Sequence, residues 1–437
     1  MSLYVGIDLG TSGCRVIVID AAGQVCGRGT APLHPSHRNG PQVEQDPAQW
    51  WQSLERALDE VLSQVSAKDI RAIAVDGTSA TLLLTDPNGR PVGPALMYDD
   101  SRAREQASRI AALAPRESGA HGATSSLAKL LYLQPSIHSG RRVLHQADWI
   151  AGRLCGRFGA SDENNALKLG YDPVTRTWPA WLEHLGVSST LLPHVVPPGT
   201  PIGTITREEA TRWRLSSATL VVAGTTDSVA GFLATGAAEF GEAVTSLGST
   251  LVLKVLSDKP VFVPPHGVYS HRLGDQWLVG GASNSGGAVL LKFFGMERLQ
   301  ELTPRLNPER PTGLGYYPLL RPGERFPVND PQRRPQVHPR PRDDAVFLQG
   351  LLEGIADIEQ QGYRLLARLG APYPRSVRSI GGGAANSAWI RLRQRLLGVP
   401  MVVPAHTEAA YGAARLAYWG CNPRPDALPP RSIVTSE

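Results

Sequence analysis

The first twenty residues place an apolar run and a β-branched run on either side of a glycine-rich turn. The segment YVGIDLGTSGCRVIVID, residues 4–20, begins as an apolar run, enters a turn of small residues next to one acid, Asp8, and leaves as a β-branched run. Alternating β-branched residues are typical of strands, and Gly and Ser between two such runs indicate a hairpin. The pattern therefore predicts a β-hairpin with a carboxylate at its mouth.

A helix and a further strand are predicted after this hairpin. Apolar residues recur at helical spacing over residues 48–65, behind Asp46 and Pro47, which read as an N-cap and a first-turn proline. The run IRAIAVDG, residues 70–77, is short and β-rich and reaches Asp76 at its end, as expected for a buried parallel strand. Strand, helix and strand in this order predict a βαβ unit and an α/β fold.

The second half of the chain repeats the opening hairpin. Both LGTSGCRVIVID, residues 9–20, and LGSTLVLKVLSD, residues 247–258, run from Leu-Gly through small hydroxyl residues into an alternating strand and then Asp. We interpret them as matching hairpins of a duplicated α/β domain, facing each other across a cleft as two phosphate-binding turns. The alternative is a chance similarity. Because 437 residues exceed one ordinary core, we expect two domains, residues 1–220 and 221–437.

A third glycine turn lies towards the C-terminus. A long amphipathic helix is predicted over residues 345–369, and VRSIGGGAANSAWIRLRQRLLG, residues 377–398, then reads as strand, Gly381-Gly382-Gly383 and helix. Glycine lets the backbone approach a flat ligand because no Cβ intervenes, and a helix N-terminus offers free N–H groups. Three glycines alone are a weak signal. Their place as the third such turn in an α/β chain gives them weight.

Composition and charge exclude several other classes of protein. The net charge of +5 is modest, and the basic run PQRRPQVHPRPR, residues 331–342, is rich in Pro and lacks aromatic residues, which favours a solvated loop over a nucleic-acid surface. The four cysteines have no CxxC spacing, so neither a zinc site nor a disulfide framework is expected. No apolar run approaches the roughly 18 residues of a membrane helix, and the chain enters a strand without a charged leader. We expect a cytoplasmic protein.

Two common nucleotide-binding motifs do not fit this sequence. The chain has no GxxxxGK[ST] and no Gly-Lys dipeptide, which excludes a Walker-type phosphate loop. The segment GIDLGTSG lacks the GxGxxG register and puts an acid where a pyrophosphate would lie. Dinucleotide binding is therefore not expected.

An acid beside a phosphate-binding turn fits a magnesium-dependent phosphoryl transfer. Mg²⁺ takes one or two carboxylates together with phosphate oxygens, so Asp8 is predicted to hold the metal or its waters, with Thr11 and the glycine amides on the transferred phosphate. Transfer to an alcohol also needs a base. Asp227, in GTTDSVAGF, follows an apolar run and precedes a predicted helix. It is the candidate base, with a helix N-cap as the alternative role.

These segments together resemble a known family. GIDLGTSGCRVIVID, VAGTTDSVAGFLATGA, SLGST, YYPLLRPGERFPVNDP and IGGGAANSAW fall in the order seen in the FGGY family of carbohydrate kinases and span nearly the whole chain. The resemblance implies a duplicated ribonuclease-H-like, actin-like fold with ATP and Mg²⁺ in an interdomain cleft.

The resemblance also implies roles for individual residues. It assigns catalysis to Asp227 as base, Asp8 as metal ligand, and Thr11. The sugar-binding set that it implies is Asp8, Ser12, Gly13, Thr78, Ser79, Tyr98, Asp100, Thr226 and Asp227. The nucleotide-binding set that it implies is Thr11, Gly248, Ser249, Gly286, Gly382, Gly383 and Asn386, the last three on the adenine side.

The sequence departs from the family pattern in two places, and the first departure narrows the choice of acceptor sugar. Where xylulose and glycerol kinases carry Gln-Met-His-Gly or a related Gln/Arg/Glu signature, this chain reads AVDGTSATLLL, residues 74–84. This DGTSAT turn, with LMYDDSRA at residues 96–103 and a short chain, resembles the compact branch typified by cyanobacterial and plant plastid sugar kinases that act on D-ribulose. Ser79 and Thr78 are then expected to meet sugar hydroxyls. The second departure, RLRQRLLG at residues 391–398, replaces a Gln and an Ala-Asp pair on the nucleotide side.

The resulting hypothesis is an ATP-dependent kinase that phosphorylates the terminal hydroxyl of a free ketopentose, converting D-ribulose to D-ribulose 5-phosphate. D-xylulose, or another sugar or polyol, is the alternative acceptor. A rival from another class is an actin-like ATP-binding switch without a small-molecule acceptor, which has no need of Asp227 or of the DGTSAT turn. We expect no nucleic-acid or membrane partner, and the sequence leaves the choice between monomer and homodimer open.

Overall fold

The computed structural model describes residues 1–136 and 141–422, and the chain divides into two compact units. Unit 1 is Met1–Gly236, His271–Asp275 and Glu408–Glu437, and unit 2 is Ala237–Ser270 and Gln276–Thr407. Asp227 thus belongs to the same unit as Asp8. The division at residue 220 stays a prediction about functional domains, and the end of the second predicted domain, residues 423–437, lies outside the described residues.

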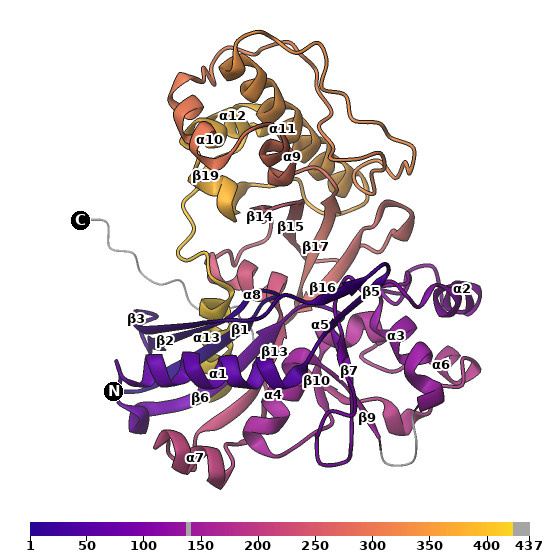
Figure 1. The fold of residues 1–437 in the computed structure, drawn as a ribbon, viewed down its shortest axis with the longest axis vertical. Coiled ribbons are helices and arrows are strands. Elements are labelled where there is room, and N and C mark those ends of the chain that lie inside the picture. Colours follow the sequence, from indigo (N-terminus) through magenta and orange to yellow (C-terminus); the bar gives the residue numbers. More distant parts are fainter. Residues whose placement is uncertain (137–140, 423–437) are drawn as a thin grey trace. The chain divides into compact units, whose positions relative to one another are not determined.

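Unit 1 is built on a six-stranded sheet with the order β12-β13-β6-β1-β2-β3 (Figure 1). The predicted hairpin is β1 (Leu3–Leu9) and β2 (Gly13–Asp20), which pair antiparallel. The predicted strand after it is β6 (Ile70–Gly77), which lies parallel to β1, so the βαβ prediction is confirmed. The sheet is completed by β3 (Val25–Pro32), β12 (Pro201–Thr204) and β13 (Leu220–Thr226).

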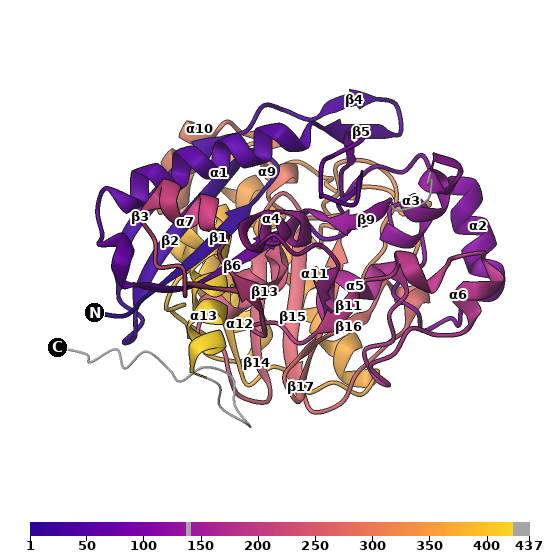
Figure 2. The same cartoon turned by 90° about the horizontal axis from the view of Figure 1, so that it is seen from below.

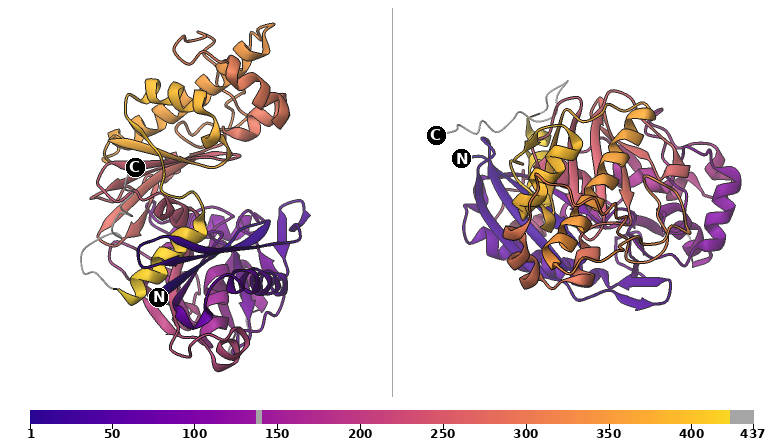
Figure 3. Two further views of the ribbon diagram at one scale, coloured as in Figure 1. Left: turned by 90° about the vertical axis from the view of Figure 1, so that its left-hand side faces the viewer. Right: turned by 90° about the horizontal axis from the view of Figure 1, so that it is seen from above.

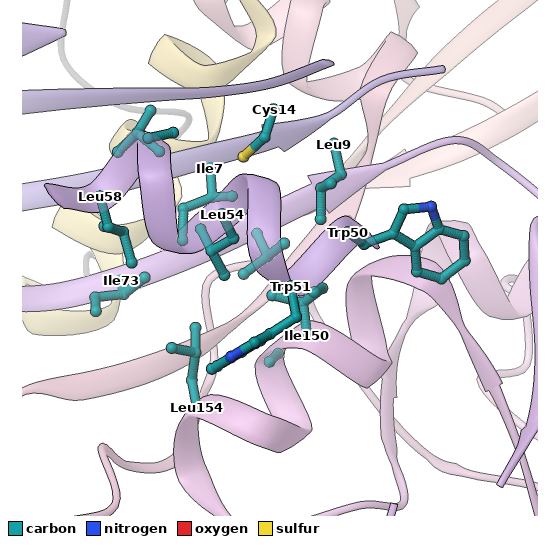
Figure 4. Close-up of a cluster of buried hydrophobic side chains, with 14 of the residues drawn as sticks. Ile7, Leu9, Cys14, Trp50, Trp51, Leu54, Leu58, Ile73, Ile150 and Leu154 are labelled. Atoms are coloured by element: carbon teal, nitrogen blue, oxygen red, sulfur yellow. The ribbon is translucent and has the colours of Figure 1, made fainter. Parts of the chain in front are cut away.

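Two helices cover one face of this sheet. The predicted first helix is α1 (Pro47–Leu62), capped by the Asp46 side chain, and it crosses β2 and β3 (Figure 2). The second is α4 (Gln146–Cys155), which contacts β6 and β13. Trp50, Trp51 and Leu54 of α1 pack with Ile7 of β1 and Ile150 of α4 in one buried cluster (Figure 4). This core anchors the strand that carries Asp8.

The opposite face of the sheet is covered by α8 (Asp227–Ala234) and α13 (Ala409–Cys421), which pack against each other. Figure 3 shows α13, in yellow, against the indigo strands of the N-terminal hairpin. Successive strand residues point to opposite faces, so Gly6 faces away from the core that contains Ile7. A Cβ on Gly6 would lie 1.9 Å from the Ala410 carbonyl oxygen. The absence of a side chain at Gly6 therefore lets α13, from the far end of the chain, lie directly on β1.

The rest of unit 1 forms a smaller sheet with its own helices. This sheet has the order β4-β5-β8-β7-β9. Its strands are β4 (His37–Asn39), β5 (Gln42–Gln45), β7 (Leu82–Thr85), β8 (Ala95–Leu96) and β9 (Arg142–His145). The remaining elements are α2 (Arg104–Leu113), α3 (Ser126–Leu133), α5 (Glu163–Ala166), α6 (Trp181–His184), α7 (Arg207–Trp213) and the parallel pair β10 (Ala160–Asp162) and β11 (His194–Val196).

Unit 2 repeats the pairing pattern of the large sheet of unit 1. The second predicted hairpin is β14 (Glu242–Leu247) and β15 (Leu251–Ser257), again antiparallel, and β18 (Ser376–Ile380) lies parallel to β14 as β6 does to β1. The other strands of this sheet are β17 (Gln276–Ser283), β19 (Met401–Val402) and β16 (Tyr269–Leu273), of which residues 271–273 are assigned to unit 1. The predicted duplication of the hairpin is confirmed.

The helices of unit 2 surround a separate core. The predicted long helix is α11 (Asp344–Arg368), whose apolar face packs against β15 and β17. The glycine turn after β18 forms the short 3₁₀ helix η7 (Gly382–Ala385) and leads into α12 (Ser387–Leu397), as predicted. The others are α9 (Gly287–Phe293) and α10 (Met296–Leu302). Among residues 1–136 and 141–422, no helix combines the length and apolar character needed to cross a membrane.

Candidate active site

Three carboxyl groups gather at one edge of the large sheet of unit 1. Asp8 on β1 and Asp76 on β6 are register partners, and Asp227 directly follows β13, the next strand. Because the carboxyl ends of parallel strands meet at one edge of a sheet, these side chains come together. The charges of Asp8 and Asp227 both act on Asp76, and both raise its pKa.

Asp8 and Asp76 differ in the surrounding groups that shift their pKa values. Asp8 is 6% exposed; burial raises its pKa, and the guanidinium of Arg15, 3.3 Å away, opposes that shift. Asp76 is 0% exposed, and no N–H or alcohol group of the described residues donates to its oxygens. Burial, followed by the charges of Asp8 and Asp227, raises the pKa of Asp76 well above its usual value. Two adjacent buried carboxyls cannot both ionise cheaply, so the neighbouring charges favour the protonated form of Asp76, whereas Arg15 favours the ionised form of Asp8.

Asp76 is the residue of this group that was not assigned to the site from the sequence. The strand that carries it was predicted, and so was its parallel arrangement. The available signal was that two predicted strands, the first of the hairpin and the one after the first helix, each carry an acid near their end. Only the register, Asp8 opposite Asp76, makes these two acids neighbours.

The first hairpin turn presents small side chains to solvent. The Gly10 N–H donates to the Gly13 carbonyl oxygen at 3.1 Å, which closes the turn. The side chains of Thr11 and Ser12 are exposed, whereas Gly13 is buried. The Gln45 side chain donates to the Thr11 carbonyl at 3.2 Å. Gln45 thus holds the turn beside Asp8 through its backbone, and the hydroxyl groups of Thr11 and Ser12 are available to a ligand.

Asp227 lies in the first turn of α8 rather than at its N-cap position. The N-cap is Thr226, whose side chain makes no capping hydrogen bond and whose buried Oγ1 has no partner within the described part of the chain. Asp227 is half-buried, and its Oδ1 accepts the Ser228 N–H at 2.7 Å. The positive end of the helix dipole favours a carboxylate here. Asp227 therefore lies beside the Asp8–Asp76 pair, at the positive end of the α8 dipole.

The DGTSAT turn lies next to the carboxyl groups. Thr78 is buried, and its N–H and Oγ1 donate to Gln146 Oε1 at 3.0 and 2.9 Å. The Ser79 Oγ is buried and has no hydrogen-bond partner in residues 1–136 and 141–422. A buried hydroxyl without a partner is costly unless a ligand or water completes it, so Ser79 fits the predicted contact with a sugar hydroxyl.

Tyr98 and Asp100 lie on the neighbouring segment in different environments. Tyr98 is 43% exposed. Asp100 is buried, and it accepts hydrogen bonds from the Val43 N–H at 2.7 Å and from the Arg102 guanidinium at 2.7–3.0 Å. Both oxygens of the Asp100 carboxylate therefore already accept hydrogen bonds from the protein itself. Its sugar contact stays a prediction, and Tyr98 is the more open of the two.

In unit 2, the second hairpin turn is supported by the start of α9. The carbonyl oxygens of Gly248 and Ser249 accept the N–H groups of Gly287 and Ala288 at 2.8 and 3.2 Å. Gly286 has φ +149°, and a Cβ there would lie 2.7 Å from the Ser249 carbonyl oxygen. Only glycine lets the two turns touch, so Gly286 shapes the predicted phosphate turn.

In the third glycine turn, Gly382 has free space where a side chain would lie, whereas at Gly383 that space is occupied. A Cβ on Gly382 would meet no atom of the described residues within 4 Å, whereas one on Gly383 would lie 2.5 Å from the Trp389 ring. Asn386 caps α12, because its Oδ1 accepts the Trp389 N–H at 3.0 Å, and its Nδ2 donates to Thr303 Oγ1 at 3.2 Å. Gly382 thus borders open space, and the side chain of Asn386 holds the helix behind it.

A buried ion pair lies beneath the two glycine turns of unit 2. Arg393 is fully buried and donates to both Glu359 oxygens at 2.6 Å and to Ser379 Oγ at 2.6 Å. Thr245 Oγ1 donates to Glu359 Oε1 at 2.5 Å. Thr245 and Ser379 are register partners on β14 and β18, just before the turns. Neither Arg393 nor Glu359 was assigned from the sequence, although Arg393 lies in the RLRQRLLG departure.

The carboxyl groups fit a magnesium site only if phosphate supplies further ligands. Among the described residues, no group of three or more His, Cys, Asp or Glu side chains is arranged to hold a metal ion. Mg²⁺ is usually bound by one or two carboxylates plus substrate phosphates and water. Asp8, with the buried carboxyl of Asp76 as its neighbour, matches that requirement.

The repeated sheets define a two-domain, actin-like α/β fold. A solved structure described as a "xyloylose kinase" from Brucella ovis superimposes with a TM-score of 0.88 at 26% identity, over 97% of this chain and 91% of that one. The fold and the acidic site define a sugar phosphotransferase.

Sequence comparisons also identify a sugar kinase, and they show which family it belongs to. Residues 3–234 match the N-terminal domain, and residues 243–421 the C-terminal domain, of the FGGY family of carbohydrate kinases. The chain belongs to this family and is an ATP-dependent sugar kinase. It is 28% identical to the xylulose kinase of Escherichia coli (strain K12), over 96% of this chain and 90% of that one. It is 30% identical to the xylulose kinase of Streptomyces coelicolor, over 95% and 87%.

Proposed function

We propose that this kinase transfers the γ-phosphoryl group of ATP to the terminal hydroxyl of a free ketopentose, with D-ribulose as acceptor and D-ribulose 5-phosphate as product. The observation that carries the proposal is the cluster of Asp8, Asp76 and Asp227 beside the DGTSAT turn. On its acceptor side, this reaction needs a charged base, a second charge that can hold a cation, and a hydroxyl group that can bind the sugar. The cluster supplies the first two, and Ser79, whose hydroxyl has no partner among the described residues, supplies the third.

Asp227 is the proposed general base. It lies in the first turn of α8, half-buried, where the positive end of the helix dipole favours a carboxylate. It would accept the proton of the attacking hydroxyl as the bond to phosphorus forms. The amides of the 10–13 turn and the Thr11 hydroxyl would orient the transferred group, and the turns at Gly248, Ser249, Gly286 and residues 382–386 would hold the nucleotide.

Asp8 is the residue that would hold Mg²⁺, together with phosphate oxygens. When bound, the ion neutralises phosphate charge and orients the phosphates. Asp76 supports this role, because its pKa is raised well above the usual value by burial and by the charges of Asp8 and Asp227, which favours Asp8 as the ionised partner. Arg15, 3.3 Å from Asp8, keeps the carboxylate in place.

The acceptor is proposed from the turn after β6. In this chain the turn carries Thr78 and Ser79, both short hydroxyl side chains, where a Gln-Met-His-Gly turn would offer an amide and an imidazole. D-ribulose and D-xylulose differ in the configuration of one hydroxyl, so a change of hydrogen-bonding groups at this turn is of the right kind to discriminate between them. D-xylulose is the second candidate, favoured by the names of the two xylulose kinases compared above.

A coupled ADP-release assay over free sugars tests the proposal. The panel is D-ribulose, D-xylulose, their L-forms, the pentitols and glycerol, each with ATP and Mg²⁺. We expect the highest kcat/KM with D-ribulose and a product phosphorylated at the terminal carbon, as read by mass spectrometry and NMR. A higher kcat/KM with D-xylulose would make the second candidate correct. ATP hydrolysis that no sugar stimulates would favour the nucleotide-switch alternative.

A further inference from the structure

A buried lysine connects the two segments that are predicted to contact the ketose. Lys129 lies in α3 and is 0% exposed. Its Nζ donates to the Ala80 carbonyl oxygen at 2.8 Å and to the Met97 carbonyl oxygen at 2.6 Å. Ala80 lies within the DGTSAT turn, and Met97 directly precedes Tyr98. A single side chain therefore ties residues 78–81 to residues 97–100.

The DGTSAT turn has a backbone conformation that needs such support. Ala80 has φ +68°, in the left-handed region that residues other than glycine rarely occupy. The turn is held at its other end by Gln146, which accepts both the N–H and Oγ1 of Thr78, while Thr78 and Thr81 share a hydrogen bond of 2.5 Å. Ser79, whose Oγ has no partner among the described residues, lies between these two anchors.

The contacts of Lys129 suit a positioning role in either protonation state. Burial lowers the pKa of Lys129 to about 7; Asp100 and Asp99 oppose that shift, whereas Lys168 and Arg102 add to it. A neutral amine keeps two N–H donors and an ammonium has three. Both forms can therefore satisfy the two carbonyl oxygens, and the turn stays held on both sides of neutral pH.

We propose that Lys129 is a positioning residue that sets the affinity for the ketose by holding the Ser79 turn against the Tyr98 segment. The inference rests on the proposed function, because it takes these segments as the sugar site. Preorganised binding groups lose less entropy when the ligand binds, so a loosened turn weakens sugar binding without altering the groups that transfer the phosphate.

The test compares Lys129→Met with Lys68→Met. Methionine has nearly the length and volume of the lysine stem but no N–H donor, and exposed Lys68 provides the same substitution away from the turn. The first readout is amide hydrogen exchange followed by mass spectrometry, which needs no substrate. We expect faster exchange in peptides covering residues 76–85 and 95–103 of Lys129→Met only. Unchanged exchange in both segments would overturn the positioning role.

The second readout is the kinetics with the best sugar of the panel. We expect Lys129→Met to raise the ketose KM about tenfold or more, with kcat within about threefold and the KM for ATP unchanged, because two carbonyl oxygens lose charge-assisted donors. Faster exchange with an unchanged ketose KM would show that the turn does not bind the sugar. A wild-type enzyme that no sugar stimulates would refute the proposed function, and the exchange data would still decide the structural role of Lys129.

A conservative variant keeps the test decisive if Lys129→Met does not fold. Lys129→Arg retains a cation with several N–H donors in the same place. We expect its ketose KM and its exchange in both segments to lie between those of the wild type and Lys129→Met, or above the wild type alone if only Arg folds. Wild-type ketose KM and wild-type exchange in both segments would refute the proposal, whether seen in a folded Lys129→Met or, if that variant does not fold, in Lys129→Arg.

Discussion

The two hairpins of the duplicated fold have the same backbone but opposite chemistry. Aligned on Leu-Gly, Asp8 of β1 corresponds to Ser246 of β14. The parallel neighbour of Asp8 is Asp76, whereas that of Ser246 is Ile380. One copy thus places two carboxyls beside its turn, and the other places a hydroxyl and an apolar side chain there. A neutral turn can accept nucleotide phosphates without repulsion, and an acidic one needs a cation.

The buried charges of the two units differ in the same way. In unit 2, Arg393 and Glu359 satisfy each other and bind the polar groups of both strands. In unit 1, Asp76 is buried beside a second carboxyl, Asp8, and without an N–H or alcohol donor among the described residues. Satisfied buried charges rigidify a structure, and unsatisfied ones store strain that a ligand can relieve. The duplication therefore separates a satisfied buried ion pair in unit 2 from the candidate active-site carboxyls in unit 1.

The largest expected effect on activity comes from replacing the matching residues of the two hairpins, Asp8 and Ser246, by alanine in separate variants. Asp8→Ala removes the charge that the proposed metal needs, so we expect kcat on the sugar to fall about a thousandfold, with the fold retained. Ser246→Ala, at the matching position of unit 2, should keep most of the activity. Steady-state kinetics at saturating Mg²⁺ and a circular-dichroism spectrum decide the matter. Near wild-type turnover of Asp8→Ala would remove Asp8 from the mechanism.

The next effect concerns stability rather than chemistry. Arg393→Met leaves Glu359 charged and buried without its partner, so we expect a loss of about 3–5 kcal/mol in the free energy of unfolding of unit 2. The double variant Arg393→Met/Glu359→Gln removes both charges and should recover much of that loss. Urea unfolding followed by hydrogen exchange in unit 2 peptides measures both. A loss below about 1 kcal/mol for the single variant would mean that the pair carries no structural weight.

A third prediction separates catalysis from helix stabilisation at two first-turn acids. Asp227→Asn keeps a polar side chain at the start of α8 but cannot accept the proton, so we expect kcat to fall at least about a hundredfold, with little change in Tm. Asp344→Asn, at the first residue of α11, should leave kcat unchanged. If Asp227→Asn retained most of its kcat while binding sugar and ATP normally, its carboxylate would be structural.

The smallest expected effect is a change in the pH dependence of stability. The pKa of Asp76 is raised in the folded state, so this group stabilises the fold fully below the unfolded pKa of about 4, and that contribution is lost as pH rises through the folded pKa. Without Mg²⁺, Asp76→Asn should flatten this fall and be the more stable protein at pH 7, by about 1 kcal/mol. Equal free energies of unfolding for the two proteins at every pH between 4 and 8 would contradict it.

Elements whose signal is local could be predicted from the amino-acid sequence. Both hairpins, the βαβ order, α11 and the strand-glycine-helix segment follow from side-chain alternation, helical spacing and turn residues, each of which is complete within a short window. For the same reason Asp8 could be assigned to a hairpin turn. The family segments added the order of the parts, because five short motifs in one sequence are specific together.

Long-range packing selects which residues distant in sequence become neighbours. The register of β6 against β1 brings Asp76 to Asp8, and the packing of α3 brings Lys129 to the turn at Ala80. Likewise, α13 from the C-terminal part of the chain joins unit 1 because Gly6 leaves room for it. Periodicity tells which face of an element is apolar, but the partner of that face is chosen by burial and packing over the whole domain. That choice made an unassigned strand-end acid part of the site.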